Sequence, residues 1–138
     1  MKALTESQIR SIQSTVYVVE EKLQDMEAVV YYTLQHREKG IAVTVEHDFT
    51  TTELQVFQQK SKEIKEVLSK IARTYGLESR QVSLKKLVST KAAFMWEDAS
   101  GSGFDSLKGH GAIDEGYREE YEKLFNQLTK LADELIGP

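Results

Sequence analysis

Hydrophobic residues recur every three or four positions in three long stretches of this chain. In the clearest stretch, only Ser61 interrupts the series, which consists of Leu54, Phe57, Ile64, Leu68, Ile71 and Tyr75. This spacing places the side chains on one face of an α-helix, alternating as the a and d positions of a heptad do. A helix with one narrow apolar face must be covered by other helices. We therefore expect an all-α fold organised around residues 51–75.

Local signals predict where the helices begin and end. Thr5 with Gln8, and Thr50 with Glu53, have the spacing of capping boxes, in which a side chain and a backbone N–H are bonded reciprocally. Gly76 is suited to a left-handed carboxyl cap. The predicted helices are 6–38, 51–75, 80–98 and 115–136.

The first predicted helix is longer than its neighbour. At 1.5 Å per residue, 6–38 spans roughly 50 Å and 51–75 roughly 38 Å. Its apolar surface also widens towards the carboxyl end, beyond what one neighbouring helix can cover. We therefore expect homodimerisation through this helix.

The period changes between 41 and 49, where Ile41, Val43 and Val45 alternate with less apolar residues. Alternation predicts a short extended segment, which lies across the end of the bundle or pairs with a second copy. The predicted fold is thus an up-down-up-down four-helix bundle, with a long first helix and a short extended segment between helices 1 and 2. Its 138 residues fit a single domain, 1–138.

The third predicted helix has a broad apolar face that suits contact with two neighbours. Lys91 lies inside the apolar arc, and Trp96 lies at its edge. In the simpler interpretation Lys91 lays its methylenes on the core and keeps its ammonium in water. In the functional one it is partly desolvated and acts as a base or holds an anion.

Residues 99–112 carry four glycines and no periodicity, which predicts a long flexible connection. Lys108 and His110 give this connection two groups able to hold an anion or move a proton, and Trp96 lies just before it. They are either ordinary residues of a solvated loop or part of a ligand or partner site at one end of the bundle.

No motif points to catalysis, a metal or a cofactor. The chain has no cysteine, and no histidine follows a glutamate at the three-residue spacing of a di-iron bundle. Asp98, Ser100 and Ser102 have the spacing of the first ligands of a calcium loop, but Gly109 stands where the closing glutamate belongs. No phosphate-binding glycine motif and no nucleophile elbow occurs. We expect no catalytic residue, no metal and no cofactor.

Charge is unevenly distributed along the chain, although the net charge is only −4. Residues 50–92 carry nine Lys or Arg against four Glu, whereas 93–138 carry four basic residues against ten acidic ones. Two interpretations of this uneven charge are open. Either neighbouring helices of opposite charge attract one another, or the chain presents a basic face to an anionic partner. The members of that face are Lys60, Lys62, Lys65, Lys70, Arg73, Lys85 and Lys86. Without interleaved aromatic residues, nucleic-acid binding is not expected.

These patterns favour a non-enzymatic helical interaction or oligomerisation module, with a second copy or another protein as its partner. One alternative is a small-molecule-binding or catalytic bundle that uses Trp96, Lys108 and His110, with Lys91 facing inward. A weaker alternative is an accessory nucleic-acid-binding protein. The chain has neither the apolar run of a signal peptide nor a membrane-spanning stretch, so we expect a soluble, cytoplasmic protein without membrane contact.

Overall fold

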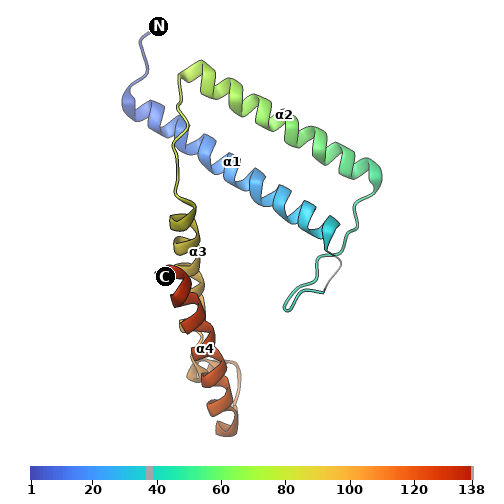
Figure 1. Cartoon of the computed structure of the whole chain (residues 1–138), viewed down its shortest axis with the longest axis vertical. Coiled ribbons are helices and arrows are strands. Elements are labelled where there is room, and N and C mark those ends of the chain that lie inside the picture. The colour runs from blue at the N-terminus through green and yellow to red at the C-terminus, as the bar shows by residue number, and fades with distance from the viewer. Residues whose placement is uncertain (37–38, 138) are drawn as a thin grey trace. The chain divides into compact units, whose positions relative to one another are not determined.

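The computed structural model describes residues 1–36 and 39–137 (Figure 1). Its elements are α1 (Glu6–Gln35), α2 (Thr51–Tyr75), α3 (Leu84–Ser100), the 3-10 helices η1 (Phe104–His110) and η2 (Glu115–Tyr117), and α4 (Arg118–Ile136). No strand occurs in these described ranges, which confirms the predicted all-α class. In the same part of the chain, no helix combines the length and the apolar content needed to cross a membrane.

The chain forms two compact units, unit 1 (Met1–Ser79) and unit 2 (Arg80–Pro138). In unit 1, α1 packs against α2, and in unit 2, α3 packs against α4. Each unit is therefore built around a pair of helices. The bundle topology and the single domain stay predictions.

The capping signals in unit 1 are confirmed. The Thr5 hydroxyl accepts a hydrogen bond from the Gln8 N–H, and the Gln8 side chain accepts one from the Thr5 N–H. Thr50 and Glu53 make the same pair of bonds, so α2 begins and ends at the predicted residues. Gly76 closes α2 in the left-handed conformation, at φ 65°.

The end of α1 differs from the prediction. The helix ends at Gln35, and His36 has an extended backbone with φ −119°. The two predicted last residues, 37 and 38, lie outside the described residues. With 30 residues against 25, α1 exceeds α2 by only roughly 8 Å. The length argument for dimerisation through α1 is correspondingly weaker.

Ser61, the interruption in the α2 series, lies in the contact between α1 and α2. Its side chain is buried, and its hydroxyl donates to a carboxylate oxygen of Glu27 at 3.0 Å. The Lys65 ammonium lies 2.9 Å from the same carboxylate and, as the main cause, lowers the pKa of Glu27. Leu23, one turn before Glu27, is 2% exposed. A small polar residue at this position thus lets a charged pair form beside the apolar contact.

We expect Ser61→Ala to lower the free energy of unfolding by about 1 kcal/mol, because the Glu27 carboxylate loses a buried donor. Thermal unfolding followed by circular dichroism measures the change. Ser69→Ala, at an exposed position of the same helix, is the matched control and should have little effect. Equal shifts in the two variants would contradict the importance of this hydrogen bond.

Residues 41–49, predicted as an extended segment, form no strand, and Ile41 and Val43 are exposed. The start of the third helix differs from the prediction. α3 begins at Leu84 rather than at 80, because the Ser83 hydroxyl accepts from the Lys86 N–H and caps the helix there. It continues to Ser100, two residues beyond the prediction.

Small residues make the contact between α3 and α4. Ala92, Ala99 and Ala132 are 3%, 9% and 1% exposed. At one end the Ser89 hydroxyl donates to the Ile136 carbonyl, and at the other the Tyr121 hydroxyl donates to the Ser102 carbonyl. The two helices are therefore antiparallel. Because the most buried residues of this contact are alanines, many of the larger apolar side chains of both helices stay exposed.

Candidate functional site

The connection between α3 and α4 is ordered by an aromatic cluster. The sequence predicts a flexible connection over 99–112, whereas in the structure residues Phe104–His110 form η1. Phe104 is 2% exposed and meets the Tyr121 ring edge-on, at 5.6 Å between ring centroids. The Arg118 guanidinium lies 4.5 Å from the centre of the Phe104 ring. The prediction fails because one large apolar side chain among the glycines docks onto α4.

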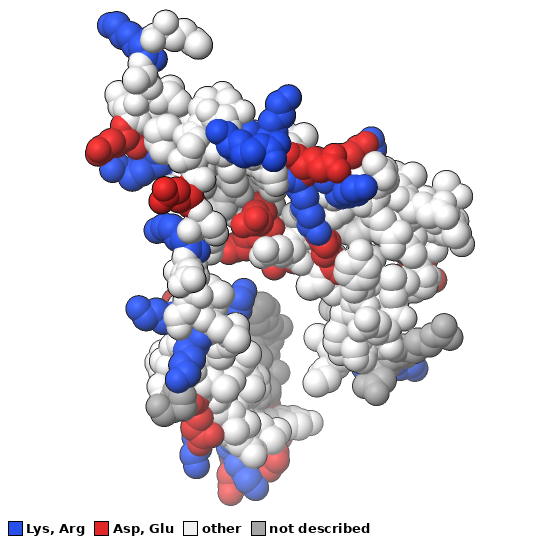
Figure 2. Space-filling view, turned by 45° about the horizontal axis from the view of Figure 1, so that its top comes forward, with Lys and Arg blue, Asp and Glu red and all other residues white. Residues whose placement is uncertain are grey.

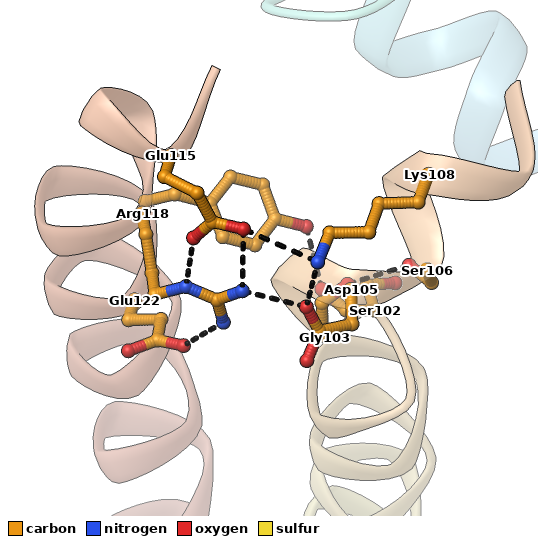
Figure 3. A network of polar contacts seen from close by, with 9 residues as sticks. Ser102, Gly103, Asp105, Ser106, Lys108, Glu115, Arg118 and Glu122 are labelled. Atoms are coloured by element: carbon orange, nitrogen blue, oxygen red, sulfur yellow. Dashed lines mark hydrogen bonds and ion pairs between the residues drawn. The ribbon is translucent and has the colours of Figure 1, made fainter. Parts of the chain in front are cut away.

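A network of five charged side chains covers this cluster (Figure 3). The Arg118 guanidinium donates to Asp105 at 2.6 Å, to Glu115 at 2.7 Å and to Glu122 at 3.2 Å. The Lys108 ammonium lies 3.1 Å from Asp105 and 3.2 Å from Glu115. Asp105 and Glu115 thus bridge the two cations, and η1, η2 and α4 are joined.

The network shifts the pKa values of its members. Hydrogen bonding from Arg118, with help from Lys108, lowers the pKa of Glu115 to about 2. The same two cations lower the pKa of Asp105, and Asp105 followed by Glu115 raises the pKa of Lys108. The two cations are thus already paired with carboxylates. This arrangement stabilises a fold element rather than leaving a free charge for a ligand.

The network predicts a loss of stability in acid. Because Glu115 has a lower pKa in the folded chain than its ordinary value of 4.5, its contribution is complete above about pH 4.5 and is lost as the pH falls towards 2. We expect Arg118→Gln to lower the melting temperature at pH 7, and the gap to the wild type to narrow between pH 4.5 and 2.

Melting curves at several pH values test this expectation. Lys130→Gln removes an exposed lysine of the same helix that lies outside the network, and serves as the control. If the difference in melting temperature between R118Q and the wild type is as large at pH 2 as at pH 7, the ionised carboxylates do not cause that difference.

An open groove of about 520 Å3 runs along one side of unit 2. Lys91, Phe94, Met95 and Asp98 of α3 line it, together with Phe125 and Leu128 of α4. The apolar members are large, and Phe94 and Met95 are 62% and 49% exposed. The groove therefore presents an apolar floor with one cation and one anion at its border.

The four residues singled out from the sequence have different positions. Lys91 lines the groove, whereas Trp96, five residues later, points about 140° away around the helix axis. Lys108 belongs to the charged network, and His110 is the exposed last residue of η1. Lys91 and Lys108 thus belong to two separate features of unit 2.

Several residues of these features were not predicted from the sequence. In the sequence, Asp98 matches only the first position of a calcium loop, although its charge is opposite to that of Lys91 seven residues earlier. Arg118 has Glu115 three residues before it and Glu122 four residues after it, a spacing that indicates ion pairs on a helix surface. That spacing could have revealed half of the network, but the tertiary contact with Asp105 and Lys108 could not be read from it.

Unit 1 has a smaller groove, about 390 Å3, between α1 and α2. It is lined mainly by aliphatic residues such as Val16, Val19 and Ile64.

The predicted basic face is not continuous on the side of unit 1 seen in Figure 2, where Lys and Arg lie next to Asp and Glu. Two lysines of the predicted basic face are paired, Lys60 with Glu63 and Lys65 with Glu27.

Residues 1–36 and 39–137 contain no group of three or more His, Cys, Asp or Glu placed to hold a metal ion. Comparison of the chain with protein-family models, curated proteins and solved structures found no match.

Proposed function

We propose that this chain is a non-enzymatic helical module that acts by associating with other helices, with a second copy of itself as the first partner. The observation that carries this proposal is the exposed apolar face of α4. Four leucines follow one another at spacings of four, three and four residues, and each is about half exposed: Leu124 53%, Leu128 43%, Leu131 54% and Leu135 51%.

The position of these leucines explains their exposure. At 100° per residue they centre about 70° around α4 from Ala132, which faces α3. The folded chain covers them only in part, and the fully buried residues of the contact with α3 are small ones. Covering apolar surface gains about 25 cal/mol per Å2, so a row of leucines favours a further helix strongly. The alternating spacing of four and three residues is the one that lets apolar side chains of one helix pack against those of a neighbouring helix.

The four-helix bundle predicted from the sequence is part of this proposal. Each pair of antiparallel helices, α1 with α2 or α3 with α4, supplies two helices of such a bundle and leaves one side to be covered. Association through apolar faces is also favoured over anion binding at the loop end or along α2, because the lysines that would bind an anion there are already in ion pairs: Lys108, Lys60 and Lys65.

Sedimentation equilibrium between about 1 µM and about 100 µM tests the proposal. We expect the mass of the wild type to rise from monomer to dimer, and Leu131→Glu to weaken association by at least about tenfold, since the carboxylate would be buried in an apolar contact. Asn126→Glu adds the same charge at an exposed position on another side of α4 and should associate as the wild type does. A wild type that stays monomeric throughout would overturn the proposal.

A further inference from the structure

Lys91 and Asp98 are two opposite charges on the same exposed side of α3. They are seven residues apart, two helical turns, and both line the groove of unit 2. Neither side chain forms an ion pair with any residue that the structure describes, and both are exposed. A long apolar face with one free cation and one free anion at fixed spacing can be matched by a copy of itself.

Reversing the direction of α3 exchanges these two charges. The midpoint between Lys91 and Asp98 lies between Phe94 and Met95. If a second α3 packs antiparallel about this midpoint, each Lys91 faces Asp98 of the second copy, and Phe94 faces Met95 of the second copy. Such an isologous contact, in which residue i meets j and j meets i, is the form of most protein dimers.

The leucines of α4 have the same kind of symmetry. They form two pairs with a common midpoint between Thr129 and Lys130: Leu128 with Leu131, and Leu124 with Leu135. The hydrogen bonds from Ser89 to Ile136 and from Tyr121 to Ser102 give the register of α3 on α4. Interpolated between these two bonds, the centre of the α3 pattern lies level with the centre of the α4 pattern. One two-fold axis therefore serves both helices.

We propose that the groove side of unit 2 pairs with the same side of a second copy about this axis, so that α3 packs antiparallel on α3 and α4 on α4. This inference rests on the proposed function and names its partner and register. In the alternative two-fold placement, with α3 over α4 of the second copy, Lys91 and Asp98 face the leucine side of α4 instead of each other. Burying unpaired charges is unfavourable, so the antiparallel placement is preferred.

The absence of cysteine makes a cross-linking test direct. Met95 lies next to the proposed axis, so Met95→Cys should form a disulfide with its own copy under mild oxidation, since cysteines bridge when their Cα atoms come within about 7 Å. Met26→Cys, on α1, is the matched control, because Met26 and Met95 are both 49% exposed. We expect a covalent dimer of the M95C chain and a monomer of the M26C chain. Cross-linking of M26C without M95C would overturn the inference in favour of dimerisation through α1.

Charge reversal tests the register independently. Lys91→Asp and Asp98→Lys each place like charges opposite one another twice per dimer, and each should weaken the dimer by about tenfold or more in sedimentation equilibrium. The double variant K91D/D98K, and an equimolar mixture of the two single variants, should restore the affinity of the wild type. Circular dichroism checks that the exposed substitutions leave the helices intact.

The result separates the two proposals. A wild-type dimer whose affinity is unchanged in K91D and D98K overturns the inference and leaves the interaction module in place. A monomeric wild type overturns both.

Discussion

Phe104→Ala is expected to lower the free energy of unfolding of unit 2 by about 3–5 kcal/mol, the usual cost of deleting a buried phenyl ring. Phe104 is 2% exposed, packs against the Tyr121 ring and lies beneath the Arg118 guanidinium. Its removal leaves a cavity at the point where η1 meets α4. It also removes the surface on which the charged network rests, so the ion pairs of Arg118 lose their fixed geometry.

Urea unfolding followed by the fluorescence of Trp96, which lies on α3 in unit 2, measures this loss. Val82→Ala, at a position 52% exposed just before α3, is the control and should cost less than about 0.5 kcal/mol. If F104A is unfolded without urea, Phe104→Leu keeps most of the apolar volume and should retain a measurable transition. A stability of F104A equal to that of V82A would show that η1 is not docked as described.

Leu23→Ala should lower the free energy of unfolding by about 2–5 kcal/mol, the range for deleting a buried leucine. Leu23 is the one buried residue among those of α1, at 2% exposed, and it lies one turn from Glu27, which holds Ser61 and Lys65 of α2. The substitution removes the apolar part of the contact and exposes the polar part to water, which weakens the ion pair as well.

Urea unfolding followed by far-ultraviolet circular dichroism measures this effect, since Trp96 does not lie in unit 1. Val18→Ala, on the same helix and 47% exposed, should change stability by less than about 0.5 kcal/mol. A similar loss in V18A and L23A would mean that α1 depends on helix propensity and not on its contact with α2.

Local features of the fold could be predicted because their causes lie within a few residues. The capping boxes at Thr5 and Thr50 and the left-handed Gly76 each involve groups at most five residues apart, and the bounds of α2 follow from them. The start of α3 differs from the prediction although its cause is also local, since the Ser83 cap lies within three residues of the N–H that it accepts from. The ordered structure within 99–112 was not predicted for a different reason. Phe104 docks on α4, and no local sequence pattern shows that contact.

The candidate site was predicted only in part. Lys91 was singled out from its place within an apolar arc and does line the groove, but its relation to Asp98 depends on which side of α3 is left uncovered. Lys108 was singled out as a free cation, whereas Asp105 and Glu115 hold it in ion pairs. Paired and unpaired lysines look alike in a sequence because the partner is set by folding.

By itself, the sequence determined the helical class, the capped ends of α2 and the face of each helix that is apolar, since these depend on backbone hydrogen bonding and on side-chain spacing along one helix. Only the tertiary structure decided which part of each apolar face is covered. Alanines bring α3 and α4 close together and leave the leucines of α4 at the surface, because two helices can approach only where both side chains are small. Periodicity gives the direction of a side chain, but its burial depends on which neighbour fits against it.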